Sequence, residues 1–382
     1  MHMKRIMINT LIGMTVLSGQ AFAAAAPSPT LTQTQSQTQT LSLAQALLMA
    51  TTNDPELTLM DEKIALAERE LVQVNANAAY KRTETHYEYN KADYVSYRKS
   101  YLLTPLKKEN SVASIKRQKD SKINSIKLDL MNQYYGVQTQ LDTLSDAKRS
   151  LASLEKEIQA KSKELALGKI TQLDFNSYEI KQLEMEFSVK KAEIDLATGY
   201  MKFASAANQP LSYKFTPVAF NTSVAPYENI NLTDVLANER SKNDELLNKQ
   251  AAIKEMETEI QINIDSQYEM GNTDSATNVL QDDLKAAQKD LANIEATIDL
   301  NLRLDNYKLQ SSYNSILVSK ASLALAQKEF DVAKAKYGVG TISLIDYLAK
   351  QEALDKADSS YSSSVSQYQI AVEKFKMGHF VK

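Results

Sequence analysis

The sequence predicts a mainly α-helical protein that consists of two copies of one long antiparallel helical hairpin. Three observations predict this class: a scarcity of glycine and proline, apolar residues at heptad spacing, and an internal repeat. The 382 residues include nine glycines and seven prolines, far fewer than enzyme folds of this length need for their turns and loops. No proline lies between Pro105 and Pro210 or after Pro226, so long helices can run there without a break.

Residues 1–23 have the features of a secretory signal peptide. Lys4 and Arg5 precede an apolar run over 6–17, and Ala21-Phe22-Ala23 closes the segment as a cleavage site. The run is shorter than the roughly 20 residues that span a bilayer, which disfavours the alternative of an N-terminal membrane anchor. We expect cleavage before Ala24 and a mature protein outside the cytoplasmic membrane, beginning with a polar low-complexity arm over residues 24–40.

An internal repeat divides the remaining chain into a first helical hairpin over 41–207 and a second over 231–382. The segment 151–174 matches 323–346 without a gap, at a constant offset of 172. Near the start of each copy the offset is 189, so the first copy carries about 17 additional residues. Between the copies, residues 208–230 contain three prolines and are predicted to form a linker.

Heptad spacing predicts that the helices of each hairpin pack as coiled coils. Apolar residues recur every seventh position from Leu173 to Met201, and a 4-3 spacing continues from Tyr347 to Phe375. A helix over about residues 111–166 would be about 80 Å long. We therefore expect an elongated protein whose helices bury their apolar faces against each other and against neighbouring subunits.

Each hairpin is predicted to turn at a short motif of a glycine, a hydroxyl residue and an acid. The glycine permits the left-handed conformation that ends the first helix. The hydroxyl residue and the acid three positions later have the spacing of a capping box, which starts the second helix. For these acids helix capping is strongly favoured over catalysis, and it is compatible with a role at a pore. The residues are Gly168, Thr171 and Asp174 in the first copy and Gly340, Ser343 and Asp346 in the second.

With its signal peptide, duplicated hairpin and Gly-x-Ile-[Ser/Thr]-x-x-Asp tips, nearly the whole mature chain resembles the TolC-type outer-membrane efflux proteins. The resemblance implies three subunits that form an α-barrel across the periplasm, with a pseudo-sixfold arrangement of the two-copy chain. It also implies that the tips meet the adaptor protein of an export system. Tyr337 matches a gating tyrosine, Asp346 matches an acid at the narrow entrance, and Asp174 is its counterpart in the first copy. The adaptor-contacting tips would be Leu167, Gly168, Lys169, Val339, Gly340 and Thr341.

The same resemblance implies two membrane strands in each repeat, and the sequence supports little of this. Tyr80–Pro105 alternates weakly, and Asp265–Leu280 is too short for two spanning strands and a turn. We expect at most a short β-hairpin region per repeat, as in a divergent family member with reduced or missing β-barrel strands. Membrane contact is expected at the end opposite the tips.

The sequence offers no chemistry for catalysis, so an enzyme is not expected, and neither is a cofactor. His86 and His379 are isolated and the chain has no cysteine, which argues against a metal site, and a net charge of −3 gives no reason to expect a nucleic-acid partner.

The predicted function is a trimeric export duct in the outer membrane and periplasm, working with an adaptor and an inner-membrane transporter. The alternative is a structural coiled-coil protein of the envelope without a pore, located at the cell surface or elsewhere outside the cytoplasmic membrane without a membrane-spanning barrel. A helical adaptor is disfavoured, because β-rich segments typical of adaptors are not recognisable.

Overall fold

The computed structural model describes residues 39–52, 54–84, 91–218, 224–227, 231–270 and 275–377. The expected signal peptide and all but the last two residues of the polar arm lie outside these ranges, as do His86 and His379. Within them the chain is helical apart from short connections and one parallel pair of strands, β1 (Gln39–Leu41) and β2 (Phe215–Pro217). The mainly α-helical class predicted from the sequence is confirmed.

The helices form two sets of four that follow the sequence repeat. The first helix of the second set begins 189 residues after its counterpart, and the last begins 172 residues after its own. The first set is α1 (Leu43–Thr52), α2 (Pro55–Thr83), α3 (Lys91–Ala166) and α4 (Gln172–Ala206), and the second is α5 (Leu232–Lys242), α6 (Asp244–Met270), α7 (Ser275–Gly338) and α8 (Leu344–Met377).

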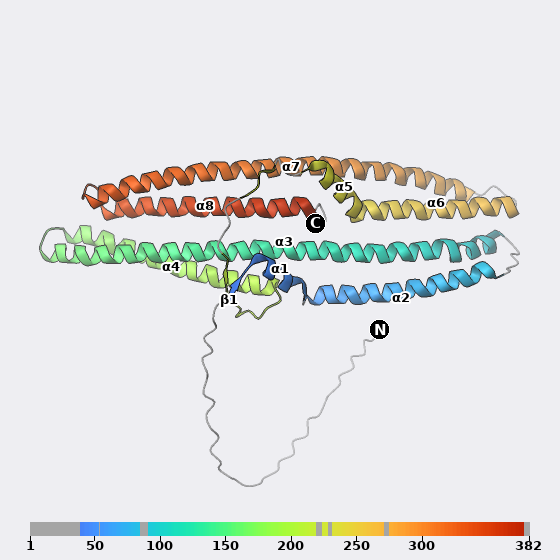
Figure 1. Ribbon diagram of the computed structural model, residues 1–382, viewed down its shortest axis with the longest axis horizontal. Coiled ribbons are helices and arrows are strands. Elements are labelled where there is room, and N and C mark those ends of the chain that lie inside the picture. The colour runs from blue at the N-terminus through green and yellow to red at the C-terminus, as the bar shows by residue number, and fades with distance from the viewer. Residues whose placement is uncertain are drawn as a thin grey trace, which may run out of the picture. The chain divides into compact units, whose positions relative to one another are not determined.

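Within the compact unit Thr38–Lys382, four rows of helix lie side by side (Figure 1). Helix α3 packs on α2 and α4 along one side and on α6 and α8 along the other, and α7 packs on α6 and α8. The order across the layer is therefore α2 with α4, then α3, then α6 with α8, then α7. With 76 residues, α3 is about 114 Å long, so it connects both ends of the layer.

Halfway along the first hairpin lies an aromatic cluster formed by Tyr134, Tyr200, Phe203 and Phe215, all of which are buried. The rings of Phe203 and Phe215 are 4.2 Å apart between centroids. The tyrosine hydroxyls donate to strand carbonyls, Tyr134 to Leu41 at 2.8 Å and Tyr200 to Phe215 at 2.9 Å. The cluster therefore holds both strands on α3 and α4 while leaving no tyrosine hydroxyl without a partner.

The second hairpin has a matching core between α7 and α8, centred on Tyr368. Its side chain is 2 % exposed, and its hydroxyl donates to the carbonyl of Ala225 in the connection between the two hairpins, at 2.9 Å. The connection between the hairpins is therefore fixed to the first through Phe215 and to the second through Tyr368. The buried members of this core are Val235, Leu302, Leu309, Ile316, Val365, Tyr368 and Phe375.

The two segments considered for membrane strands are helical over most of the residues that the structure describes, which agrees with the expectation of at most a short β-hairpin region per repeat. Tyr80–Thr83 belongs to α2, and α3 already begins at Lys91. Near the start of α3, Tyr94 and Leu103 are buried, while Arg98 pairs with Asp265 of α6 at 2.9 Å. The alternation itself, at Thr85, Tyr87 and Tyr89, lies outside the described residues. The second segment, Asp265–Leu280, is likewise helical up to Met270 and from Ser275 onward.

Pro105 lies inside α3 without ending it. Proline has no N–H, so the carbonyl of Tyr101, four residues earlier, loses its helical donor. A side-chain nitrogen of Arg82, on the neighbouring helix α2, donates to that carbonyl at 3.2 Å. A contact between helices thus replaces the missing helical hydrogen bond.

Candidate functional site

The two hairpin tips lie at the same end of the helical layer and have the same backbone geometry (Figure 1). Gly168 and Gly340 adopt φ values of 67° and 73°, in the left-handed region. At the first tip, the N–H of Gly168 donates to Leu165 and that of Lys169 to Glu164, both at 2.9 Å. The second tip repeats both bonds with its equivalent residues. This is the Schellman motif, with glycine at the position that disfavours a side chain.

A hydroxyl and a carboxylate start the returning helix at each tip. The N–H of Asp174 donates to Thr171 Oγ1 at 3.1 Å, and the N–H of Thr171 donates back to Asp174 Oδ2 at 3.1 Å. Ser343 and Asp346 make the same reciprocal pair, at 3.1 and 3.4 Å. Hydrogen bonds from the side chain and backbone of Thr171 lower the pKa of Asp174, because they favour the charged form. Thr171 and Ser343 thus cap α4 and α8.

The outermost residues of both tips are exposed, and each tip carries one large apolar side chain. Leu167 is 70 % exposed and Val339 is 76 % exposed. Each stands next to the left-handed glycine, whose backbone is open to solvent. The apolar side chain and the open backbone together form a small surface that another protein could contact. Its other members, Lys169 and Thr341, are also exposed.

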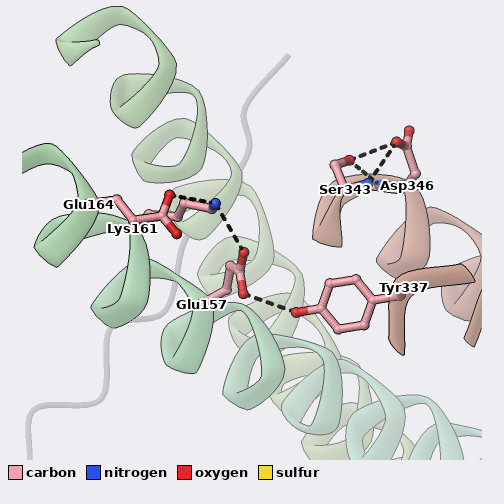
Figure 2. Close-up of polar contacts among 6 residues, drawn as sticks. All are labelled: Glu157, Lys161, Glu164, Tyr337, Ser343 and Asp346. Atoms are coloured by element: carbon pink, nitrogen blue, oxygen red, sulfur yellow. Dashed lines mark hydrogen bonds and ion pairs between the residues drawn. The ribbon is translucent and has the colours of Figure 1, made fainter. Parts of the chain in front are cut away.

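One polar contact joins the two hairpins near their tips. The hydroxyl of Tyr337 at the end of α7 donates to Glu157 Oε2 of α3 at 3.0 Å (Figure 2). Burial is the main cause that raises the pKa of Tyr337, and the bond to Glu157 adds to it. Lys161 Nζ lies 3.8 Å from Glu157 and 2.8 Å from Glu164. The phenol therefore stays protonated and donates to a carboxylate that already has a cationic neighbour.

Of the residues predicted from the sequence for the pore entrance, only Tyr337 takes part in this contact between hairpins. Asp346 stays with its own cap residue Ser343, apart from the Tyr337–Glu157 contact, as Figure 2 shows. Asp174 does the same with Thr171 at the other tip. Sequence reasoning missed Glu157, because its partner lies 180 residues away and no local motif marks it.

Further from the tips, a charged cluster lies where α3 meets α8. Arg149 reaches Asp146 at 2.8 Å and Asp355 of α8 at 2.7 Å. Burial raises the pKa of both aspartates, repulsion from Asp358 raises it further, and Arg149 partly opposes the rise. One arginine therefore balances several carboxylates, with Asp142 as a further member whose pKa is raised by burial and by Asp146.

Asp358→Asn is expected to raise the free energy of unfolding at pH 7 by about 0.5 kcal/mol, because it removes a like charge from the cluster. Because the pKa values of Asp146 and Asp355 are raised in the folded protein, the charged forms of these two carboxyl groups lower its stability. This loss of stability is complete above the pKa in the folded state and becomes smaller as the pH falls through it. The stability gained by Asp358→Asn should therefore decrease as the pH is lowered towards the ordinary pKa range of carboxyl groups. Urea titrations at several pH values measure it, with Asp120→Asn on the surface of α3 as the control. An equal gain in both variants would contradict the prediction.

Gly340→Ala is expected to lower the free energy of unfolding by about 1–2 kcal/mol, because alanine is strained at positive φ. Gly136→Ala is the matched control. It lies inside α3 with open space around its Cα, and alanine there should stabilise the helix by roughly 0.5–1 kcal/mol. Urea midpoints that move in opposite directions would support the assignment of the tip geometry. A neutral Gly340→Ala would contradict it.

Among the described residues, no group of three or more His, Cys, Asp or Glu side chains is arranged to hold a metal ion. The described helices also include none that is both long and apolar enough to cross a membrane.

Comparison with known proteins gives a clear result for structure and none for sequence. No protein-family model matches the chain, and no curated protein matches it in sequence. The fold is similar to that of the Campylobacter jejuni CmeC outer membrane channel, with a TM-score of 0.64 and 11 % identity over 88 % of this chain and 85 % of that one.

The outer membrane protein VceC from Vibrio cholerae is similar with a TM-score of 0.62 and 11 % identity, over 88 % of this chain and 96 % of that one. The MtrE outer membrane channel of Neisseria gonorrhoeae, in its open state, gives a TM-score of 0.58 and 10 % identity over 89 % of each chain. At this level of identity the likeness is one of fold. The chain has the fold of the TolC-type outer-membrane efflux channels, as its repeat and its tips predict.

Proposed function

We propose that this protein is one subunit of a trimeric export duct, a passive conduit that works with an adaptor protein and an inner-membrane transporter. In this proposal it is exported through a cleaved signal peptide and acts in the outer membrane and periplasm, with the membrane at the end opposite the tips. It performs no catalysis. The observation that carries the proposal is a single layer of helices that is open along both edges and has two equivalent tips at one end.

Both edges of the layer are apolar and exposed. Along α4 the residues at heptad spacing point away from α3, and Phe187 is 71 % exposed. Along α7 the equivalent stripe includes Val318 and Leu325, which are 67 % and 58 % exposed. Such stripes are typical of surfaces that bind another protein. The members are Leu173, Ile180, Leu183, Phe187, Ile194 and Met201 on α4, and Leu304, Val318, Leu325, Val332 and Val339 on α7.

Because the two edges differ, copies of the chain would associate head to tail, and head-to-tail contacts that close produce a ring. The lengths of the edges agree with this arrangement. One edge is α7, with 64 residues, and the other is α2 and α4 end to end, with 29 and 35 residues. A closed ring of helical layers encloses a channel along the helices, as a conduit requires.

The tips supply the contact surface for an adaptor. Leu167 and Val339 are exposed at one end of the layer, so a ring of three copies would present six such side chains around its opening. The Tyr337–Glu157 contact near the tips joins the two hairpins of one copy. Breaking it would free the hairpins to move apart at the entrance, which fits the gating role that the resemblance gives to Tyr337.

The mature protein tests the proposal in two measurements. Native mass spectrometry should give three copies, and insertion into planar bilayers should give discrete conductance steps. The alternative function, a structural coiled-coil protein without a pore, predicts no conductance and a solid rod in electron micrographs. A monomer, or an assembly without a lumen, would contradict the duct.

A further inference from the structure

Helix α2 is joined to α3 by a row of ion pairs that all have the same polarity. In each pair the carboxylate belongs to α2 and the lysine to α3. All eight side chains are between 24 % and 59 % exposed, so dissolved ions can reach them. The pairs are Glu56–Lys122 at 2.5 Å, Asp61–Lys119 at 2.5 Å, Glu68–Lys116 at 2.6 Å, and Glu70–Lys108.

The four lysines belong to a basic segment of α3, residues 98–122. This segment contains eight lysines and arginines and two acids. On its other side, Arg98, Lys99 and Arg117 pair with acids of α6. Like charges three or four positions apart on one helix repel each other. The acids of α2 and α6 therefore balance a charge that α3 alone would carry at a cost in stability.

Apolar burial contributes less to the attachment of α2 than to that of α4, although both helices pack on α3 in the same row. Two of the three buried residues of α2 are alanines, Ala67 and Ala78, which bury little apolar area. Helix α4 instead buries large side chains, among them Met185, Tyr200 and Phe203. Charge therefore accounts for a larger share of the α2–α3 contact.

Helix α2 is also a separate structural element. It begins with its own cap, because Asp54 accepts from the N–H groups of Glu56 and Leu57, both at 2.9 Å. Among the described elements, α3 is the one on which α2 packs extensively. A cavity of about 790 Å³ lies beside its first turns and is lined by polar side chains that include Lys122, so water can occupy it. Helix α2 can therefore leave α3 without unwinding α4.

We propose that α2 is a salt-sensitive element, which packs on α3 in dilute salt and detaches as the ionic strength rises. The screening length falls from about 30 Å at 0.01 M salt to about 3 Å at 1 M, which weakens the exposed pairs between α2 and α3. Screening does not weaken the apolar contacts of α4, so α4 stays packed. The inference concerns one chain and does not depend on assembly into a ring.

Amide hydrogen exchange of the mature protein, followed by mass spectrometry, tests this proposal in about 0.01 M and about 1 M KCl. A detached helix of 29 residues is only marginally stable, so detachment should appear as exchange along α2. We expect exchange in α2 to be at least about tenfold faster in concentrated salt, because four exposed pairs act together. Exchange in α4 should change less than about twofold, since its buried apolar contacts remain. Sucrose at matching osmolality should not accelerate exchange in α2.

A variant without the acids of α2 separates charge pairing from other effects of salt. It combines Glu56→Gln, Asp61→Asn, Glu68→Gln and Glu70→Gln. The matched control changes the net charge equally through exposed acids of α4 and α7 that form no described ion pair with another helix. It combines Glu179→Gln, Glu186→Gln, Asp195→Asn and Asp331→Asn.

The variant without the acids of α2 should exchange rapidly along α2 even in dilute salt and should lose the dependence on KCl there. The control variant should behave as the natural chain does. Equal acceleration in α2 and α4, unchanged or slower exchange of α2 in concentrated salt, or a control that matches the α2 variant would overturn the proposal. Loss of neighbouring copies would expose the outer edges of both α2 and α4, so it cannot imitate a change confined to α2. The number of copies, measured separately by mass, decides the proposed duct.

Discussion

Phe203→Ala is expected to lower the free energy of unfolding by about 3–5 kcal/mol, the range for removing a fully buried phenylalanine ring. Phe203 has no exposed surface, and its ring lies 4.2 Å from that of Phe215 and 6.4 Å from that of Tyr134. The cavity would open where α3, α4 and β2 meet, and close packing there leaves little freedom to refill it. Urea unfolding of the monomeric chain measures the loss.

Phe187→Ala is the matched control for this prediction. It makes the same change on the same helix, but the ring is 71 % exposed in the free chain. We expect a change within about 0.5 kcal/mol, as for a surface substitution. Equal losses for the two variants would show that the aromatic cluster does not hold the first hairpin together.

Phe187→Asp is expected to abolish assembly while leaving the isolated chain folded. Burial of a phenylalanine side chain contributes about 1.5–3 kcal/mol, and an unpaired carboxylate at the same place adds a further cost. Together these should raise the dissociation constant of each contact between copies at least about a hundredfold, since about 1.4 kcal/mol corresponds to a factor of ten. Sedimentation or mass photometry across a dilution series measures the change.

Two controls separate burial from charge. Ser188→Asp places the same charge at the next position of α4, which is exposed and points to a different side of the helix. Phe187→Leu keeps an apolar side chain on the edge. Both should assemble nearly as the natural chain does. If Ser188→Asp dissociates the assembly as strongly as Phe187→Asp, the effect comes from net charge and not from the edge.

The hairpin tips could be predicted from the sequence because their geometry depends on neighbouring residues. A glycine at positive φ and a capping pair three positions apart act within one turn of helix. The heptad spacing along α4 is equally clear in the sequence, but the surface against which these apolar residues pack is not. Phe187 lies on the outer edge of the layer and not against α3, since periodicity shows which residues share a face and gives no information about what covers it.

The helical conformation around residues 80–105 and the contacts between helices were harder to predict, for a different reason. The sequence between Tyr80 and Pro105 alternates over a few positions, and only partners on other helices show that residues 80–83 and 91–105 are helical. Those partners include Arg82, which bonds the carbonyl of Tyr101, and Asp265, which lies far along the chain. Glu157 is in the same situation, because only the fold brings Tyr337 to it.

The parallel pairing of β1 and β2 also bears on the order of folding. Leu41 aligns with Pro217, so these three-residue strands close a loop that contains the whole first hairpin. Loops of this length are entropically costly to close before other contacts have shortened them, and contacts between distant residues are slow to form. Strands β1 and β2 should therefore pair only after α3 and α4 have packed against each other, starting at their tip. Amide exchange during refolding would show protection in α3 and α4 before protection at Val218, whose N–H bonds Leu41 and the hydroxyl of Tyr134. Protection at the β1–β2 pair would thus report that the first hairpin is complete.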